Sequence, residues 1–425
     1  MSKNRRSFLQ ASMASVASGT LVMRAWGKTA PSDRVHHAVI GTGGQGSHHV
    51  RAFSNLPNAD VVAIADVDPQ RRARAVEELP NRDHVRQYAD FRDLLDDKSI
   101  DTVSIATPDH WHTPVALAAL MAGKHVYVEK PCSHTLEESY LLAKAATETK
   151  LCVQHGTQRR GNSAVMDAIQ FLRDGGIGKV LFAKAINHQR RGPIGRASIT
   201  DPPPGVNYDL WLGPAPKHAF TENRWHYQWH WFWDYGTGDF GNDGVHQVDV
   251  ARWGLGVDYP KRFTCSGGQL WYDDDHETPD TINCTFEYDD AYLMFEQRLW
   301  TPYKLEGHDN GNVFYGTDGK LVIGRSKPYY EIDGTRHEIP PSVQGENTKQ
   351  NFVRCAMAND PSQLLNEIND GSISADLCHL GNIAIRTGRG QLAYDPQRRE
   401  FPGAPEATRL VAKPYRAGYE LAYHG

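Results

Sequence analysis

The chain of 425 residues is long enough for two or three domains, and its 40% hydrophobic and 23% charged residues are typical of a soluble globular protein. A net charge of −5 without a long run of Lys or Arg excludes the basic surface that a nucleic-acid-binding protein needs. No stretch approaches the ~20 apolar residues of a membrane span, so we expect no stable span.

The N-terminal segment, residues 1–30, has the pattern of an export signal. The pair Arg5-Arg6 precedes a weakly apolar stretch, rich in Ala, Ser and Gly, that runs from about Leu9 to Met23. A twin arginine ahead of such a stretch is typical of a twin-arginine signal peptide. We therefore expect the twin-arginine export machinery as a partner and a periplasmic or other extracytoplasmic location.

A short β-branched apolar run over residues 34–40 leads into a glycine-rich turn and then into a helical stretch that begins near Ser47. A strand that feeds G-x-G-x-x-G into a helix is the context of the dinucleotide-binding fingerprint. The first glycine allows a tight turn, the second lets the backbone approach the pyrophosphate, and the third lets helix and strand pack closely. The predicted cofactor-binding residues here are Gly41, Gly43, Gly44, Gln45 and Gly46.

A second predicted strand, residues 60–66, ends in an acidic residue, Asp66, which follows Gly46 by twenty positions. A carboxylate at this place accepts hydrogen bonds from the adenosine ribose hydroxyls, which favours NAD over NADP. Arg71 and Arg72 follow closely, so NADP remains open.

The chain then alternates between strand-like and helix-like segments. Apolar runs over residues 101–107, 125–129 and 151–154 predict strands, and residues 115–122 and 136–149 predict helices. Strands separated by helices predict a doubly wound parallel sheet, which is an α/β fold.

Two proline-containing segments lie at the carboxyl edge of this predicted Rossmann domain, residues 34–155. Thr107-Pro108 ends one strand, and Glu129-Lys130 stands ahead of a proline at the end of the next. Doubly wound sheets bind their ligands at this edge. The Lys130 side chain would carry its charge into the crevice, where it can bind a sugar hydroxyl and lower its pKa.

The second half of the chain has a different rhythm. Longer alternating runs cover residues 180–188, 262–271, 280–288 and 291–299, and turn residues separate some of them. This pattern predicts an antiparallel sheet. Between the runs, residues 224–234 contain four of the ten tryptophans, which can either stack on sugar faces or form an ordinary aromatic core.

His246 follows a glycine-rich loop and begins a predicted helix, a position that exposes a side chain. Its ordinary pKa of about 6.5 suits proton transfer near neutrality, so we predict His246 as a catalytic acid/base.

The cysteines and histidines do not indicate a structural metal site. The six cysteines include no CxxC and no regular spacing, which predicts neither a zinc ribbon nor a disulfide framework. His110-x-His112 and the pair His226 and His230 have spacings that a metal could use, but no Cys or carboxylate stands at a supporting interval. We expect no metal.

These motifs together resemble the Gfo/Idh/MocA family, which is named after glucose–fructose oxidoreductase, inositol dehydrogenase and a rhizopine catabolism protein. The resemblance covers roughly residues 34–400. It rests on Gly41-x-Gly43-x-x-Gly46, Thr107-Pro108-Asp109-His110-Trp111-His112, Glu129-Lys130-Pro131 and Gly244-Val245-His246-x-x-Asp249.

The resemblance implies an N-terminal Rossmann domain, a C-terminal α/β domain with a large open, mainly antiparallel sheet over residues 156–400, and a tail at 401–425. It also implies a homo-oligomer (a dimer or a tetramer) and hydride transfer between a sugar or polyol carbon and NAD. Lys130 would orient the substrate and His246 would be the acid/base. The resemblance adds Thr107, Pro108, His112, Glu129 and Lys130 to the cofactor site, and Arg159, Trp231, Asn242 and Asp243 to the substrate site.

One position departs from the family pattern. The family commonly has Asp four residues before the histidine, where this chain has Asn242. An amide cannot stabilise an imidazolium as a carboxylate does, which leaves open whether the chain works as a plain dehydrogenase.

Three functions follow from these expectations. Outside the cytoplasm there is no nicotinamide pool, so an exported sugar oxidoreductase would hold its NAD or NADP tightly and regenerate it in place. A redox-neutral cycle meets that condition, either as paired oxidation and reduction of two sugars or as an NAD-dependent glycosidase that uses transient C3 oxidation and elimination. A non-catalytic sugar-binding protein with a vestigial nucleotide site is the third alternative.

Overall fold

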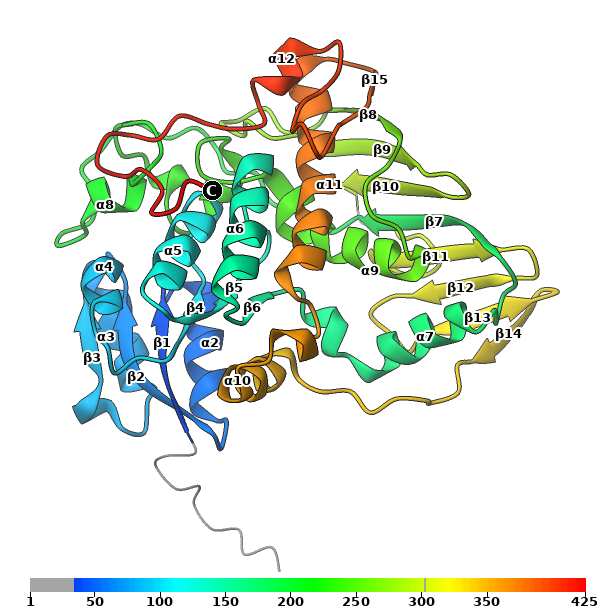
Figure 1. Ribbon diagram of the computed structural model, residues 1–425. Helices are drawn as coiled ribbons and strands as arrows, with labels where there is room; N and C mark the ends of the chain where they lie inside the picture. Colours follow the sequence, from blue (N-terminus) through cyan, green and yellow to red (C-terminus); the bar gives the residue numbers. More distant parts are fainter. Residues whose placement is uncertain (1–33, 302) are drawn as a thin grey trace, which may run out of the picture. The chain divides into compact units, whose positions relative to one another are not determined.

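The computed structural model describes residues 34–301 and 303–425, and the predicted export signal lies outside these residues. Residues from Val35 onward belong to one compact unit. Within it are two sheets, one built by the first half of the chain and one by the second (Figure 1). In the described residues, none of the helices is both long and apolar enough to span a membrane.

The first sheet is parallel, with strand order β3-β2-β1-β4-β5-β6. Its strands are β1 (Val35–Ile40), β2 (Ala59–Ala65), β3 (Arg86–Tyr88), β4 (Thr102–Ile105), β5 (His125–Val128) and β6 (Val153–His155). The intervening helices are α2 (Gly44–Ser54), α3 (Pro69–Glu77), α4 (Phe91–Leu95), α5 (Asp109–Met121) and α6 (Leu136–Thr149). The predicted doubly wound parallel sheet is confirmed, and its order reverses between β1 and β4, where such folds bind ligands.

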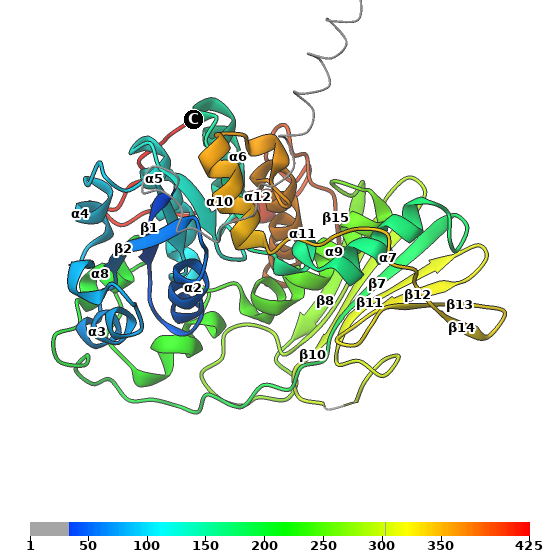
Figure 2. The same ribbon diagram turned by 90° about the horizontal axis from the view of Figure 1, so that it is seen from below.

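Separate apolar clusters cover the two faces of this sheet. On one face, Ala38 and Ile40 pack with α4, α5 and α6. On the other, Val39 packs with α2 and with Phe352 of α10 (Thr348–Ala358), a helix from the second half of the chain. α10 contacts α2 and β5, and Figure 1 and Figure 2 both show it next to α2. A sequence-distant helix therefore completes the Rossmann layer.

The second sheet has nine strands in the order β14-β13-β12-β11-β7-β10-β9-β8-β15. They are β7 (Val180–Asn187), β8 (Arg262–Gly268), β9 (Thr281–Glu287), β10 (Tyr292–Arg298), β11 (Asn310–Gly316), β12 (Lys320–Ile323), β13 (Tyr329–Ile332), β14 (Thr335–Glu338) and β15 (Gln391–Leu392). β7 and β10 run parallel, and the other described pairs are antiparallel. The prediction of a large, mainly antiparallel sheet is confirmed, although β11 to β15 were not foreseen.

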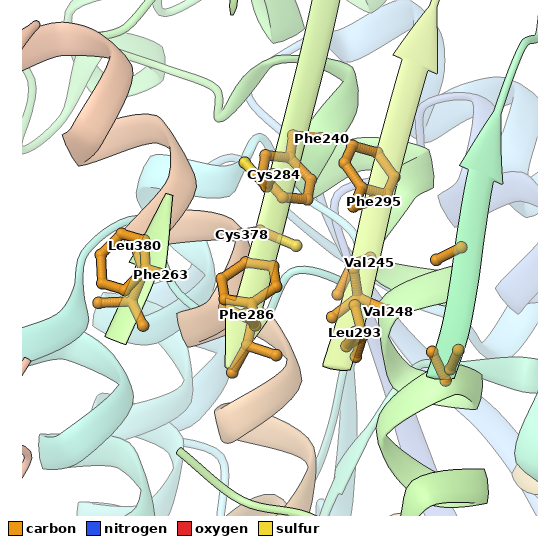
Figure 3. Packing of buried hydrophobic residues seen from close by; sticks show 14 of the residues in the cluster. Phe240, Val245, Val248, Phe263, Cys284, Phe286, Leu293, Phe295, Cys378 and Leu380 are labelled. Carbon is orange, nitrogen blue, oxygen red and sulfur yellow. The ribbon is translucent and has the colours of Figure 1, made fainter. Parts of the chain in front are cut away.

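One face of this sheet packs on α7 (Ser163–Arg173), α9 (Val245–Leu255) and α11 (Ile368–Thr387). Side chains alternate along the strands, as in β8, where Phe263 is buried and Thr264 is exposed. Figure 3 shows the aromatic rings of this core, with Phe240 next to Phe295 of β10. These two rings stack with centroids 4.1 Å apart. This stacking anchors η6 (Phe240–Gly244), the π-helical turn ahead of α9, to the sheet.

Cys265 and Cys284 form a disulfide between directly opposite residues of β8 and β9. The cysteine pattern predicted no disulfide framework, and it did not foresee this single pair. The two cysteines are separated by 19 positions and become neighbours only through the register of the antiparallel strands. The remaining four cysteines are free and buried.

Candidate active site

A cavity of about 720 Å³ lies at the carboxyl ends of the parallel strands, a size usual for cofactor and small-molecule sites. Both halves of the chain line it. The predicted residues on its wall are Gly41, Gly43, Gly44, Gln45, Asp66, Thr107, Pro108, His112, Glu129, Lys130, Asn242, Asp243 and His246. Arg71, Arg191, Tyr227 and Trp229 line it as well.

The glycine turn is built so that side chains are excluded. Gly41 has φ +80°, and a Cβ there would lie 2.8 Å from the carbonyl oxygen of Ala106. A Cβ on Gly46 would lie 1.9 Å from the carbonyl oxygen of Gly41, so helix and strand pack through this glycine. Gly46 accordingly packs against the backbone of the turn and does not line the cavity.

The N-terminus of α2 faces the cavity without a side-chain cap and without an acidic residue in its first turn. A Cβ on Gly44 would meet nothing within 4 Å, so there is open space beside the helix end. Uncapped N–H groups and the helix dipole favour an anion at such a place. These features fit the pyrophosphate of a dinucleotide.

Asp66 lines the cavity, and neighbouring groups hold its carboxylate in place. Oδ2 accepts hydrogen bonds from the backbone N–H of Thr42 at 2.7 Å and from Thr42 Oγ1 at 3.0 Å, and Oδ1 accepts one from the N–H of Asp68 at 2.9 Å. Burial raises the pKa of Asp66 although these bonds oppose it. Its contact with a ribose stays a prediction.

Arg71 and Arg72, because of which NADP was kept as an alternative cofactor, have different surroundings. Arg72 Nη1 donates to the backbone carbonyl of Asp66. Arg71 lines the cavity beside Gly43, and its Nη2 lies 2.5 Å from Nδ1 of His226 in the second half of the chain. This contact joins the two walls of the cavity.

Glu129 connects the end of β5 to α2 and to the segment after β6. Its Oε1 lies 2.9 Å from each of Gln45 Nε2, His49 Nε2 and Gln158 Nε2. Burial opposes ionisation, but the bond from His49 and the nearby Lys130 hold the pKa of Glu129 well below its ordinary value. The carboxylate therefore fixes the strand end that carries Lys130.

His112 holds the two strand-end segments together. Its Nδ1 lies 2.6 Å from the carbonyl oxygen of Pro131 and its Nε2 lies 2.8 Å from that of Thr107. Both ring nitrogens are thus occupied by the backbone. The predicted cofactor contact of His112 stays a prediction, and the hydrogen bonds show a structural role.

Lys130 Nζ projects from the end of β5 to η6. It donates to the backbone oxygen of Asn242 at 2.5 Å and to Asn242 Oδ1 at 3.0 Å. Asn242 Nδ2 in turn donates to Asp239 Oδ1 at 2.9 Å and to the hydroxyl of Tyr227 at 3.3 Å. Asn242 is therefore bonded to Lys130, and no hydrogen bond joins it to His246 in the described residues.

His246 lies in the first turn of α9 at the cavity wall, and it is partly buried, not exposed as expected. Its Nδ1 is buried without a hydrogen-bond partner among the described residues. Burial, together with the charges of Lys130 and Arg159, lowers the pKa of His246 to about 3. The expectation of an ordinary pKa was wrong, and at neutral pH the imidazole is neutral and able to accept a proton.

The predicted substrate residues are not all at the cavity. Asp243 lines it and pairs with Arg191, whose Nη2 lies 2.9 Å from Asp243 Oδ2. Arg159 is not on the wall, and its Nη2 donates to Asn310 Oδ1 at 3.0 Å.

Trp231 is only 1% exposed and packs inside an aromatic cluster, so the prediction that it contacts substrate was wrong. Trp225 and Trp229 line the cavity, while Trp225 and Trp231 belong to the buried aromatic cluster; stacking of the segment on a sugar stays a prediction.

Arg191 and Tyr227 were missed as cavity residues. Arg191 comes shortly after β7, and strand ends are where site residues gather, so its position was the available signal. Tyr227 lies inside the tryptophan-rich segment, and nothing in the local sequence distinguishes its hydroxyl from the aromatic groups around it.

Of the histidines whose spacing a metal could use, His110 binds the protein backbone. Nε2 of His110 lies 3.0 Å from the carbonyl oxygen of Trp211, which ties α5 to the long segment between β7 and α9. In the described residues no group of three or more His, Cys, Asp or Glu side chains is arranged to hold a metal ion.

Two family models match the chain. Residues 35–157 match the model described as the oxidoreductase family, NAD-binding Rossmann fold (GFO_IDH_MocA), and residues 194–421 match the model of the family's C-terminal alpha/beta domain.

Two curated proteins illustrate the range of relatives. The chain is 35% identical over 221 residues to inositol 2-dehydrogenase 1 of Saccharopolyspora erythraea. The aligned region covers 52% of this chain and 54% of that protein. It is 33% identical over 207 residues to glycosyl hydrolase family 109 protein 2 of Shewanella sp. strain ANA-3. This aligned region covers 43% of this chain and 45% of that protein. The chain thus spans about half the length of these relatives.

Among solved structures, the aldose-aldose oxidoreductase from Caulobacter crescentus, in complex with glycerol, has the same fold. The TM-score is 0.66 at 19% sequence identity, and the superposition covers 85% of this chain and 99% of that one.

Proposed function

The chain belongs to the Gfo/Idh/MocA oxidoreductase family, and we propose that it is an NAD-dependent oxidoreductase acting on a hydroxyl of a sugar, polyol or glycoside. One observation carries the proposal: Lys130 and His246 line the same cavity as the uncapped end of α2 and the glycine turn. A proton acceptor and a cation thus stand beside a site that fits a dinucleotide.

Each side chain at the cavity has a separate role in the proposed oxidation of the substrate hydroxyl. Lys130 Nζ binds the substrate hydroxyl oxygen and stabilises the negative charge that develops there. The neutral imidazole of His246 accepts the hydroxyl proton. NAD, held by the glycine turn and Asp66, supplies the hydride acceptor when it is bound. Glu129 and His112 keep Lys130 and Thr107 at the cavity edge.

We propose further that the cofactor is held tightly. The contact between Arg71 and His226 spans the cavity beside Gly43, so a bound dinucleotide would be enclosed on that side. Retention suits a redox-neutral cycle, in which the same cofactor is reduced and reoxidised in one site. An NAD-dependent glycosidase is therefore the second candidate, and the likeness to a glycosyl hydrolase family 109 protein favours it.

Export through the twin-arginine machinery to the periplasm remains part of the proposal, carried by Arg5-Arg6. The disulfide between Cys265 and Cys284 supports it, because disulfides persist in oxidising compartments. The test is alkylation of free thiols followed by mass spectrometry, applied to the natural protein and to the double variant Arg5→Lys/Arg6→Lys, which should stay in the cytoplasm. Four free thiols in the natural protein and six in the double variant would agree with export.

We also propose a homo-oligomer, which forms through the open face of the second sheet. Tyr292 of β10 and Tyr315 of β11 both pair with Phe182 of β7 on this face, and the two tyrosines are 43% and 38% exposed. Light scattering of the purified protein would give a dimer or tetramer mass, and a monomer mass would contradict this.

The proposed activity is tested in two steps with the purified protein. Mass spectrometry of the nucleotide released by denaturation is expected to identify NAD or NADP. Addition of myo-inositol, levoglucosan, D-glucose or p-nitrophenyl glycosides is then followed by the fluorescence of reduced cofactor and by release of p-nitrophenol. Lasting reduction supports the oxidoreductase, and release of p-nitrophenol without net reduction supports the glycosidase. Protein that neither carries nor takes up nucleotide would contradict both and favour a sugar-binding protein.

A further inference from the structure

The side-chain amide of Asn242 has a defined orientation. Its Nδ2 lies 2.9 Å from Asp239 Oδ1, and its Oδ1 lies 3.0 Å from Lys130 Nζ. A carboxylate and an ammonium can each play only one part, since the first accepts and the second donates. The amide must therefore turn its NH₂ to Asp239 and its oxygen to Lys130.

Asp239 is itself held rigidly. It is fully buried, and Arg191 binds it in bidentate fashion, with Nε 3.2 Å from Oδ2 and Nη2 3.0 Å from Oδ1. Asn187, the last residue of β7, donates to Oδ2 at 2.9 Å. Bidentate arginine pairs fix geometry as well as charge, so the carboxylate is anchored to the sheet.

We propose that Asp239 is a positioning residue that aims Lys130 at the substrate through the carboxamide of Asn242. The inference rests on the proposed function, in which Lys130 binds the reacting hydroxyl. Asp239 would supply, from one turn earlier, the anion that the family commonly has at position 242.

The same contacts account for the departure at position 242. A carboxylate there would stand about as close to Asp239 as the amide does, and two carboxylates in one buried site repel each other and cannot both ionise easily. The amide avoids this repulsion. Because it is neutral, it also leaves the charge of Lys130 available to the substrate oxygen.

Four variants separate this role from a purely structural one: Asp239→Asn, Asn242→Asp, the double variant Asp239→Asn/Asn242→Asp, and Lys130→Met. The double variant moves the carboxylate to the family position, where it can bind Lys130 directly. Thermal melting first identifies which variants are folded.

The first readout needs no substrate. Purified protein is treated with trinitrobenzenesulfonate, and labelling of Lys130 is followed by peptide mass spectrometry, with the exposed Lys179 as internal standard. We expect Asp239→Asn to label Lys130 about threefold faster or more, because a neutral amide at position 239 no longer requires a donor from Asn242 Nδ2, so the carboxamide is held less firmly against Nζ. The double variant is expected to return to the wild-type rate.

The second readout is turnover with whichever of myo-inositol, levoglucosan, D-glucose or the p-nitrophenyl glycosides the wild type converts. We expect kcat of Asp239→Asn to fall about tenfold with bound cofactor retained, and the double variant to recover part of it. Unchanged Lys130 labelling in folded Asp239→Asn would overturn the inference, and so would a double variant that is worse than both single ones. If Lys130→Met keeps full turnover, the proposed function fails instead, whatever the labelling shows.

Discussion

Glu129 Oε1 and His49 Nε2 lie 2.9 Å apart in the interior, where the two side chains are 4% and 0% exposed. The bond joins β5 to α2, the two elements that carry Lys130 and the glycine turn. The cofactor site and the substrate lysine therefore share one buried support.

Replacement of Glu129 by Gln should destabilise the protein by about 1–3 kcal/mol, because a buried bond to a charged group is lost. The pKa of Glu129 is lower in the fold than its ordinary value. Its stabilising contribution is thus complete above the ordinary pKa and is lost as the pH falls through the folded value. Urea unfolding between pH 7 and pH 3 measures both effects. Glu338→Gln, on an exposed strand, is the control and should leave the midpoint unchanged.

Lys130→Met should retain bound cofactor and lose turnover, because the methionine fills the same space without a charge or a donor. The released nucleotide is quantified by mass spectrometry, and turnover by cofactor fluorescence. Lys179→Met, an exposed surface change, should behave as wild type. Full activity of Lys130→Met would rule out the proposed role of this lysine.

The pH dependence tests His246. With a pKa of about 3, the imidazole is in its basic form from pH 5 to pH 8 and is lost as a base only as the pH falls toward 3. We expect kcat/KM to be flat from pH 5 to 8 as far as His246 is concerned. His246→Gln should lower kcat by about 10²–10⁴. A wild-type decline centred near 6.5 that is absent from the variant would show that the histidine titrates at its ordinary pKa instead.

The two glycines Gly46 and Gly44 form a matched pair. Gly46→Ala would place a Cβ 1.9 Å from a backbone oxygen, so α2 must shift and bound nucleotide should be lost. Gly44→Ala meets nothing within 4 Å and should fold with at most a modest loss of affinity. Nucleotide content and melting temperature distinguish them, and equal behaviour of the two variants would contradict the turn geometry.

His226→Ala should speed the release of cofactor about tenfold without lowering the melting temperature, since it removes the contact with Arg71 across the cavity. Release is followed as loss of the fluorescence of bound reduced cofactor after dilution into an excess of non-fluorescent nucleotide. His218→Ala, which breaks a part-buried pair with Asp234 that does not line the cavity, is the control. Unchanged release would mean that this contact does not retain the cofactor.

Local patterns in the sequence determined a large part of this protein. The glycine turn, the parallel alternation and the strand-end residues Thr107 and Lys130 were predictable, because the turn needs particular φ angles and a strand end has a defined place in a parallel sheet. The helix over Leu136–Thr149 was predictable to the residue, since it has a threonine cap and a clear apolar period.

Only the tertiary structure decided how sequence-distant groups meet. The register of β8 against β9 joins Cys265 to Cys284, and the packing of Phe240 on Phe295 sets where Asn242 meets Lys130. Trp229 and Trp231 have the same composition around them, yet one faces the cavity and the other the core. The pKa of His246 also depends on burial and on charges from other segments. Such effects come from long-range contacts, which composition and periodicity do not encode.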